Sequence, residues 1–157
     1  MASLKAFGIK EGQGKYYEEA AYRLALIYNI MINEITSYLQ DFDLTPGKFN
    51  ILMVIQHQGQ DQGLAQVEVS KHLIVTPSNM TKLINKLENE GLVTRSALKA
   101  DRRVNMMRIT PKGSKLLDRV WGGYNEKLKM LTHGLNIPKQ KNLAALLKDW
   151  LNCLQKK

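Results

Sequence analysis

Residues 76–92, TPSNMTKLINKLENEGL, have the pattern of a short helix with one apolar and one polar face. Thr76 is a candidate N-cap, Pro77 suits the first helical turn, and Gly91 suits the exit from the helix. Spacings of three and four residues place four apolar side chains on one stripe: Met80, Leu83, Ile84 and Leu87. We expect this stripe to be buried.

The opposite face of this helix carries hydroxyl, amide and ammonium groups, on Ser78, Asn79, Lys82, Asn85, Lys86 and Asn89. Such groups bond base edges and phosphates, and the major groove of DNA is wide enough to admit a helix. Taken alone, the pattern fits an ordinary solvated face as well as a DNA-reading face. The neighbouring segments therefore have to decide between the two interpretations.

Segments on both sides favour DNA reading. Residues 64–75 predict a second short helix, which would pack through Val67 or Ala65 together with Val69 and Leu73. Two short helices separated by a tight turn make a helix-turn-helix. Residues 93–97 and 104–110 have strand composition and flank a basic loop, which predicts a β-hairpin wing.

The order of these segments resembles the MarR family of winged-helix transcriptional regulators. The resemblance rests on the helix-turn-helix, the EGLV segment, the basic hairpin and a DRR-x5-IT-xx-G pattern, formed by Asp101, Arg102, Arg103, Ile109, Thr110 and Gly113. It extends in element order from about Tyr16 to the C-terminus, but it is specific in residues only over 64–113. The family usually has glycine in the turn where this chain has Ile74, so we expect a slightly re-angled turn.

Charge points to a polyanionic partner. The chain carries 23 Lys and Arg against 14 Asp and Glu, a net charge of +9. Residues 71–112 hold nine of the basic residues against three acids, a net charge of +6 in about a quarter of the chain. The single cysteine, Cys153, excludes an intrachain disulfide and suits the cytoplasm. Signal-peptide and membrane-spanning patterns are absent from the sequence, so we expect neither secretion nor a membrane partner.

Catalytic and metal-binding patterns are missing from the sequence. His57, His72 and His133 lack the spacing of a zinc site, and the chain has no nucleophile elbow or dinucleotide fingerprint. We therefore predict a protein that is not an enzyme and that needs no cofactor or metal.

The remaining segments predict a helical frame around the winged helix. Residues 1–14 suggest a loose arm, and long apolar helices are expected over 16–39, from 110 onward through Gly122 and Gly123, and from Pro138. These helices carry more apolar surface than a lone winged helix buries. We predict a single domain over 1–157, mainly α with a small β component (α+β). In it, 45–113 form the winged helix, and 15–40 with 114–157 form a dimerisation layer.

The predicted DNA-binding residues are Thr76, Ser78, Asn79, Lys82, Asn85, Lys86, Lys99, Arg102 and Arg103. Ser78 and Asn79 lie near a helix N-terminus, which favours phosphate. An amide such as that of Asn85 bonds adenine at two places, while Lys82 and Lys86 suit base edges or phosphates. The resemblance implies that Arg103 enters the minor groove and that Lys99 and Arg102 contact phosphates. Asp101 would hold an arginine or the loop backbone in place.

The resemblance also implies a small aromatic or phenolic effector. Seven residues suit either the lining of an effector pocket or an ordinary core: Tyr16, Tyr17, Tyr28, Phe42, Phe49, Met53 and Trp121. The expected function is that of a homodimeric regulator, a ligand-responsive repressor that binds a pseudo-palindromic operator in double-stranded DNA. Two alternatives are a winged-helix protein-interaction module without specific DNA binding and a helical enzyme that processes a small molecule.

Overall fold

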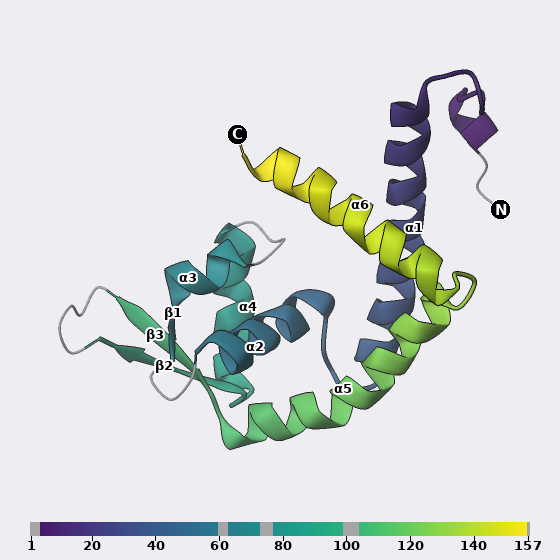
Figure 1. Ribbon diagram of the computed structural model, residues 1–157. Helices are drawn as coiled ribbons and strands as arrows, with labels where there is room; N and C mark the ends of the chain where they lie inside the picture. The colour runs from purple at the N-terminus through teal and green to yellow at the C-terminus, as the bar shows by residue number, and fades with distance from the viewer. Residues whose placement is uncertain (1–3, 60–62, 73–76, 99–103, 157) are drawn as a thin grey trace. The chain divides into compact units, whose positions relative to one another are not determined.

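The computed structural model describes residues 4–59, 63–72, 77–98 and 104–156, without the side chains of Pro77 and Ser78. The chain forms two compact units, Met1–Gly122 and Gly123–Lys157. Most described residues are helical, and one small antiparallel sheet accompanies the helices (Figure 1). This composition confirms the predicted mainly α class with a β-hairpin.

The elements follow the predicted order. In chain order they are the 3-10 helix η1 (Leu4–Phe7), α1 (Tyr16–Gln40), α2 (Pro46–Gln58), β1 (Leu64–Ala65), α3 (Gln66–Lys71), α4 (Pro77–Asn89), β2 (Val93–Ala97), β3 (Asn105–Ile109), α5 (Pro111–Thr132) and α6 (Ile137–Gln155). The α2 start follows the predicted chemistry, because the Thr45 hydroxyl accepts a hydrogen bond from Lys48 N–H at 3.3 Å and Pro46 occupies the first turn.

Three helices and the sheet share one apolar core. Three of the four residues in the predicted stripe of α4 are buried, since Met80, Ile84 and Leu87 are at most 3% exposed, whereas Leu83 is only half-buried. Their partners from the other elements include Phe49, Ile51, Leu52 and Ile55 of α2, Val69 of α3, Val93 of β2 and Met107 of β3, all equally buried. Burial of each such side chain contributes about 1.5–3 kcal/mol. The core therefore fixes α4 in the fold while its polar face stays outside.

The second predicted helix begins two residues later than expected. Leu64 and Ala65 form the strand β1 and pair with Met107 and Met106 of β3, so α3 starts at Gln66. The sheet order is β1-β3-β2, with β2 antiparallel to β3. Pairing with β3 gives the backbone N–H and C=O groups of these residues hydrogen-bond partners. In the first turn of a helix, the N–H groups would have had none. The side chain of Val67 is consequently 64% exposed.

The sequence pattern IT-xx-G forms a tight seam between the end of α4 and the start of α5. The Thr110 hydroxyl donates to the Gly91 carbonyl oxygen at 2.8 Å, and Gly113 N–H donates to that hydroxyl at 3.0 Å. A Cβ atom on Gly113 would lie 2.2 Å from the carbonyl oxygen of Leu92, so no side chain fits at this position. The Lys112 ammonium also reaches the Glu90 carbonyl oxygen at 2.7 Å.

The expectation of a loose N-terminal arm is wrong for the described residues 4–14. Leu4 and Ile9 are buried, at 4% and 6% exposure. The Glu19 carboxylate of α1 accepts a 2.8 Å hydrogen bond from Gly12 N–H and a 2.6 Å hydrogen bond from Arg23. These contacts, Arg23 first, hold the pKa of Glu19 below its ordinary value of 4.5. A charged network therefore fixes the arm to α1.

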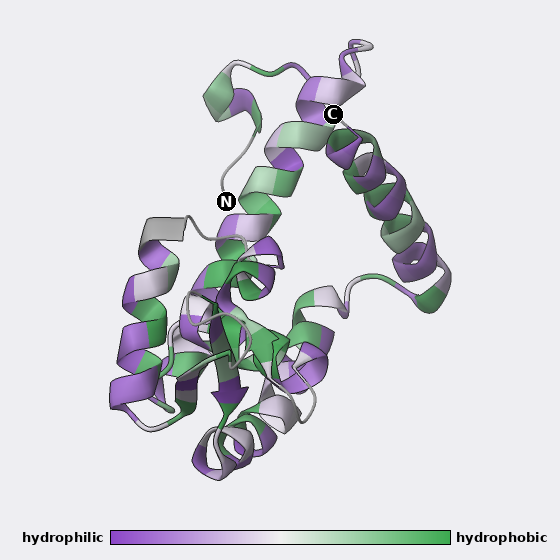
Figure 2. Ribbon diagram, turned by 90° about the vertical axis from the view of Figure 1, so that its left-hand side faces the viewer, coloured by the Kyte–Doolittle hydropathy of each residue, from purple (hydrophilic) through white to green (hydrophobic). Residues whose placement is uncertain are grey.

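Two helices carry apolar side chains that are exposed to solvent in the single chain. On α1 these are Tyr16, Tyr17, Tyr22, Leu24, Ile27, Tyr28 and Ile30, and on α6 they are Ile137, Leu143, Leu146, Leu147, Trp150, Leu151 and Leu154. Figure 2 shows such hydrophobic stretches along α1. Helix α5 continues without a break through Gly122 and Gly123, although the two glycines cost roughly 2 kcal/mol relative to alanines.

Candidate nucleic-acid interface

Burial of the inner face of α4 leaves the outer face of this helix exposed to solvent. With the stripe of Met80, Ile84 and Leu87 in the core, the side chains of Asn79, Lys82, Asn85 and Lys86 are all exposed. Gly91 ends the helix with a φ of +69°, as predicted for its exit. The next N–H groups turn back onto the last helical turn, and Leu92 N–H bonds the Leu87 carbonyl oxygen at 2.9 Å.

Three of the predicted residues surround one hollow. Asn79, Lys82 and Lys86 line a pocket of about 330 Å³ together with Thr45 and Gly47, which lie at the N-terminus of α2. Unpaired N–H groups and the helix dipole give a helix N-terminus a partial positive charge. Lys82 and Lys86 therefore line this hollow beside the N-terminus of α2, where Pro46 has no N–H and Lys48 N–H is bonded to the Thr45 hydroxyl. The positive charge of the two lysines favours an anion here.

Five predicted residues lie outside the described part of the chain: Thr76, Lys99, Asp101, Arg102 and Arg103. Ser78 lies in the first turn of α4, and its side chain is not described. The hairpin that carries the basic loop is described up to Leu98 and again from Val104. Leu98 N–H donates to the Val104 carbonyl oxygen at 2.9 Å. The strands therefore continue to the loop as a paired hairpin.

Arg95 belongs to this surface, although it is not among the predicted DNA-binding residues. Its Nη2 donates to Asn85 Oδ1 at 2.6 Å and lies 3.5 Å from Glu88 Oε2. Side chains alternate along a strand, so Arg95 shares a face of β2 with the buried Val93, the face that meets α4. This alternation was the signal that would have placed Arg95 beside α4.

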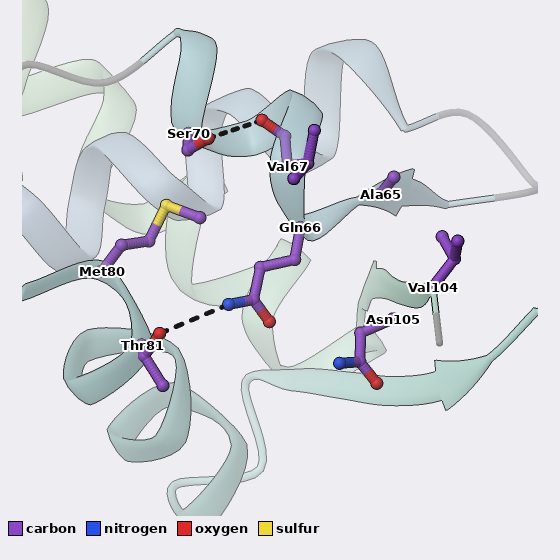
Figure 3. A pocket seen from close by; sticks show the side chains of 8 residues that line it. All are labelled: Ala65, Gln66, Val67, Ser70, Met80, Thr81, Val104 and Asn105. Atoms are coloured by element: carbon purple, nitrogen blue, oxygen red, sulfur yellow. Dashed lines mark hydrogen bonds between the residues drawn. The ribbon is translucent and has the colours of Figure 1, made fainter. Parts of the chain in front are cut away.

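A second pocket lies between α3, α4 and β3 (Figure 3). It measures about 520 Å³, and Gln66, Thr81 and Asn105 are among its lining residues. Gln66 Nε2 donates to Thr81 Oγ1 at 3.4 Å, whereas Gln66 Oε1 is buried without a hydrogen-bond partner among the described residues. The Gln66 side chain links α3 to α4. Like Arg95, it is not among the predicted DNA-binding residues.

The seven aromatic and methionine residues considered for an effector pocket occupy different surroundings. Phe49 belongs to the core, at 3% exposure, and Tyr16, Tyr17 and Tyr28 are more than half exposed. Met53 and Trp121 line a pocket of about 250 Å³ with His57. Phe42 lines another pocket, of about 320 Å³, with Arg119, whose guanidinium lies 5.9 Å from the ring centre. Of these seven residues, Met53 and Trp121 thus line the same cavity.

The described residues contain no group of three or more His, Cys, Asp or Glu side chains placed to hold a metal ion. Within the same ranges, none of the helices combines the length and the apolar character needed to cross a membrane.

The sequence of the chain is similar to the sequences of transcriptional regulators. The model of the MarR family matches residues 44–104, from the start of α2 to the hairpin. The chain is 30% identical over 98 residues to the HTH-type transcriptional regulator MhqR of Bacillus subtilis (strain 168), an alignment that covers 62% of this chain and 66% of MhqR. A second curated relative, from Thauera aromatica, is aligned over 45% of its length. The chain thus spans less than two thirds of these relatives.

Solved structures share the fold. The S. aureus MepR–DNA complex has a TM-score of 0.77 and 24% identity, with 85% of this chain and 96% of that chain covered. Bordetella bronchiseptica BpsR, whose DNA binding is regulated by 6-hydroxynicotinic acid, has a TM-score of 0.77 and 22% identity, with 84% and 98% covered. These likenesses confirm the winged-helix fold and its flanking helices.

Proposed function

Because the chain belongs to the MarR family, we propose that it is a transcriptional regulator that binds double-stranded DNA as a homodimer. The observation that carries the proposal is the hollow where Lys82, Lys86 and Asn79 meet the N-terminus of α2. Both lysine side chains are exposed and can approach a phosphate, and the dipole of α2 adds a partial positive charge. MepR, which shares the fold, was solved bound to DNA.

Recognition would combine the outer face of α4 with the wing. Helix α4 enters the major groove, and Ser78, Asn79, Lys82, Asn85 and Lys86 face base edges and phosphates there, with Thr76 at its start. In the wing, Arg103 enters the minor groove, Lys99 and Arg102 contact phosphates, and Asp101 holds the loop. The net charge of +6 over residues 71–112 supports a polyanionic partner for this surface.

The exposed apolar faces of α1 and α6 support a homodimer. A monomer would leave Leu146, Leu151 and Leu154 of α6 more than half exposed, and a second copy of the chain would cover them. We assign 15–40 and 114–157 to dimerisation and 45–113 to DNA binding within a single domain. Two reading helices related by a two-fold axis would require a pseudo-palindromic operator.

The regulator would act as a repressor that responds to a small aromatic effector and not as an enzyme. BpsR, which shares the fold, is regulated by 6-hydroxynicotinic acid. In this chain the cavity lined by Met53 and Trp121 offers an apolar and aromatic surface for such a ligand. The DNA partner and the single exposed thiol of Cys153 favour the cytoplasm.

The test is fluorescence anisotropy with the DNA upstream of the protein's own gene and with scrambled DNA, at several salt concentrations. Wild-type protein is expected to prefer the upstream DNA, with an affinity that falls steeply with salt, and Arg103→Ala is expected to weaken binding. Lys141→Ala removes one exposed positive charge from α6 and serves as the matched control. Equal, weak binding to both DNAs would contradict the proposal and favour a protein-interaction module.

A further inference from the structure

The Arg95 side chain fixes the orientation of the Asn85 amide. Arginine has only hydrogen-bond donors, so the atom of Asn85 that lies 2.6 Å from Arg95 Nη2 has to be the carbonyl oxygen Oδ1. The bond is charge-assisted and short, and Glu88 Oε2 at 3.5 Å holds the same Nη2 from the next turn of α4. The amide therefore does not turn over freely.

This orientation decides which group Asn85 presents to a ligand. The two polar atoms of an amide point in different directions, so the NH2 group of Asn85 points away from Arg95. Asn85 is exposed on the same outer face of α4 as Lys82 and Lys86. A free asparagine can turn either its acceptor oxygen or its two donors outward, whereas this asparagine directs its oxygen to Arg95 and its two donors outward.

Base edges in the major groove differ in what they accept. Guanine presents two acceptors, N7 and O6, and thymine presents one, O4. Adenine presents one acceptor and one amino donor, and cytosine presents an amino donor. The two-point bond between asparagine and adenine needs the amide oxygen to face the base, whereas here that oxygen faces Arg95, which bonds one of its two lone pairs. Guanine, with two acceptors, is the base that can accept from both hydrogens of the outward NH2 group.

We infer that Asn85, oriented by Arg95, is a specificity-determining residue that selects guanine in each operator half-site. The inference rests on the proposed function. Arg95 is a positioning residue in this scheme, because it acts through the Asn85 amide. A good side chain–base match changes affinity by roughly 5- to 150-fold between bases, and the guanine preference is expected in this range.

Two substitutions change the presented group in opposite ways. Asn85→Asp keeps the shape and the contact with Arg95, but its outward atom becomes an acceptor, so the preferred base should change from guanine to cytosine or adenine. Arg95→Met removes the donor that holds Oδ1 and keeps most of the side-chain length. The amide is then free to bond adenine at two places, so the preference should move towards adenine.

Arg108→Met is the matched control. Arg108 lies on the other strand of the same hairpin and donates to Ser96 Oγ at 3.2 Å. Its substitution removes the same charge from the same hairpin without touching Asn85. We therefore expect a lower overall affinity at most and an unchanged base preference.

The experiment selects bound sequences from a pool of random double-stranded DNA with the full-length wild type and the three variants. A wild-type motif with guanine at the position that changes in Asn85→Asp supports the inference. The same motif in wild type, Asn85→Asp and Arg95→Met would overturn the inference and leave the proposed function intact. A wild type that enriches no motif would overturn both. Asn85 is exposed, so Asn85→Asp decides the outcome alone if Arg95→Met does not fold.

Discussion

The ammonium group of Lys48 binds the carboxylate of Glu90 at 2.7 Å, and this pair joins the first turn of α2 to the residue that follows α4. Lys48 is only 5% exposed, and its Nζ also donates to the Asp43 carbonyl oxygen at 2.8 Å. A buried ammonium group needs such partners, because loss of hydration is otherwise not compensated. The end of the proposed recognition helix is thus fixed to α2 by charge as well as by the apolar core.

We predict that Glu90→Ala lowers the free energy of unfolding by roughly 1–3 kcal/mol, because Lys48 then keeps a single partner in a buried position. The effect stays below that of a fully buried pair, since the Glu90 side chain is 42% exposed. Urea unfolding followed by circular dichroism measures the change. The control is Glu68→Ala, which breaks the exposed Lys71–Glu68 pair and should cost less than about 1 kcal/mol. Equal losses would show that burial of Lys48 is unimportant.

Lys86→Ala is expected to weaken binding to all DNA sequences about equally. If the ammonium group contacts phosphate only, the slope of log K against log salt becomes less steep by about 1. Anisotropy titrations at four or more salt concentrations measure the slope, with Lys141→Ala as the control that removes the same charge elsewhere. A loss confined to particular sequences would assign Lys86 to a base edge and refute the phosphate role.

The N-terminal arm is predicted to leave α1 at low pH. Since the pKa of Glu19 in the folded chain is lower than in the unfolded chain, its contribution is complete above pH 4.5. The contribution is lost as the pH falls through the lowered pKa, when the carboxylate no longer accepts from Gly12 and Arg23. Hydrogen exchange of the Gly12 amide measures the release.

Glu19→Gln should remove this pH dependence and leave the Gly12 amide less protected at every pH. Glu18→Gln is the control, because Glu18 is a neighbouring acid that pairs with Lys15 at 3.5 Å and does not contact the arm residue Gly12. A pH profile that survives in Glu19→Gln would assign the effect to another carboxylate.

Leu151→Glu is expected to raise the dimer dissociation constant at least about 100-fold, because it removes an apolar contact and places a charge in the proposed dimer layer. Leu151 is 54% exposed in the chain, so the monomer should tolerate the change. Analytical ultracentrifugation measures the constant. Asn152→Glu, on the polar side of α6 opposite the centre of this leucine-rich face, introduces the same carboxylate and should leave dimerisation nearly unchanged. A similar loss in both variants would exclude the apolar face of α6 as the dimer contact.

Local chemistry predicted the ends of α2 and α4 well. Thr45 with Pro46, and Pro77 with Gly91, mark ends of α2 and α4, and these signals act within a few residues of the backbone they control. The spacing of Met80, Ile84 and Leu87 likewise identified the buried face of α4. Helix ends and apolar stripes can be predicted because they depend on residues that are close together in the sequence.

Features that depend on distant segments were not predicted. Strand β1 contains two residues, and it exists because β3 offers backbone partners some forty residues away. The packed arm depends on the position of Glu19 and Arg23 on α1. Arg95 meets Asn85 because the sheet packs under α4. Alternation along β2 places Arg95 on the face towards α4, but it does not indicate which residue of α4 is the partner. The DNA-binding residues remain predictions, and four of them, Thr76, Lys99, Arg102 and Arg103, lie outside the described ranges.

Gly113 has a further consequence for how the protein would behave in genetics. Its backbone lies so close to Leu92 that any side chain displaces the start of α5 or the segment that leaves α4. Substitutions at 113 would therefore be recovered in a screen for lost operator control, although Gly113 offers DNA no side chain at all. Such mutants would look like contact mutants in the phenotype, and their lower melting temperature would tell them apart.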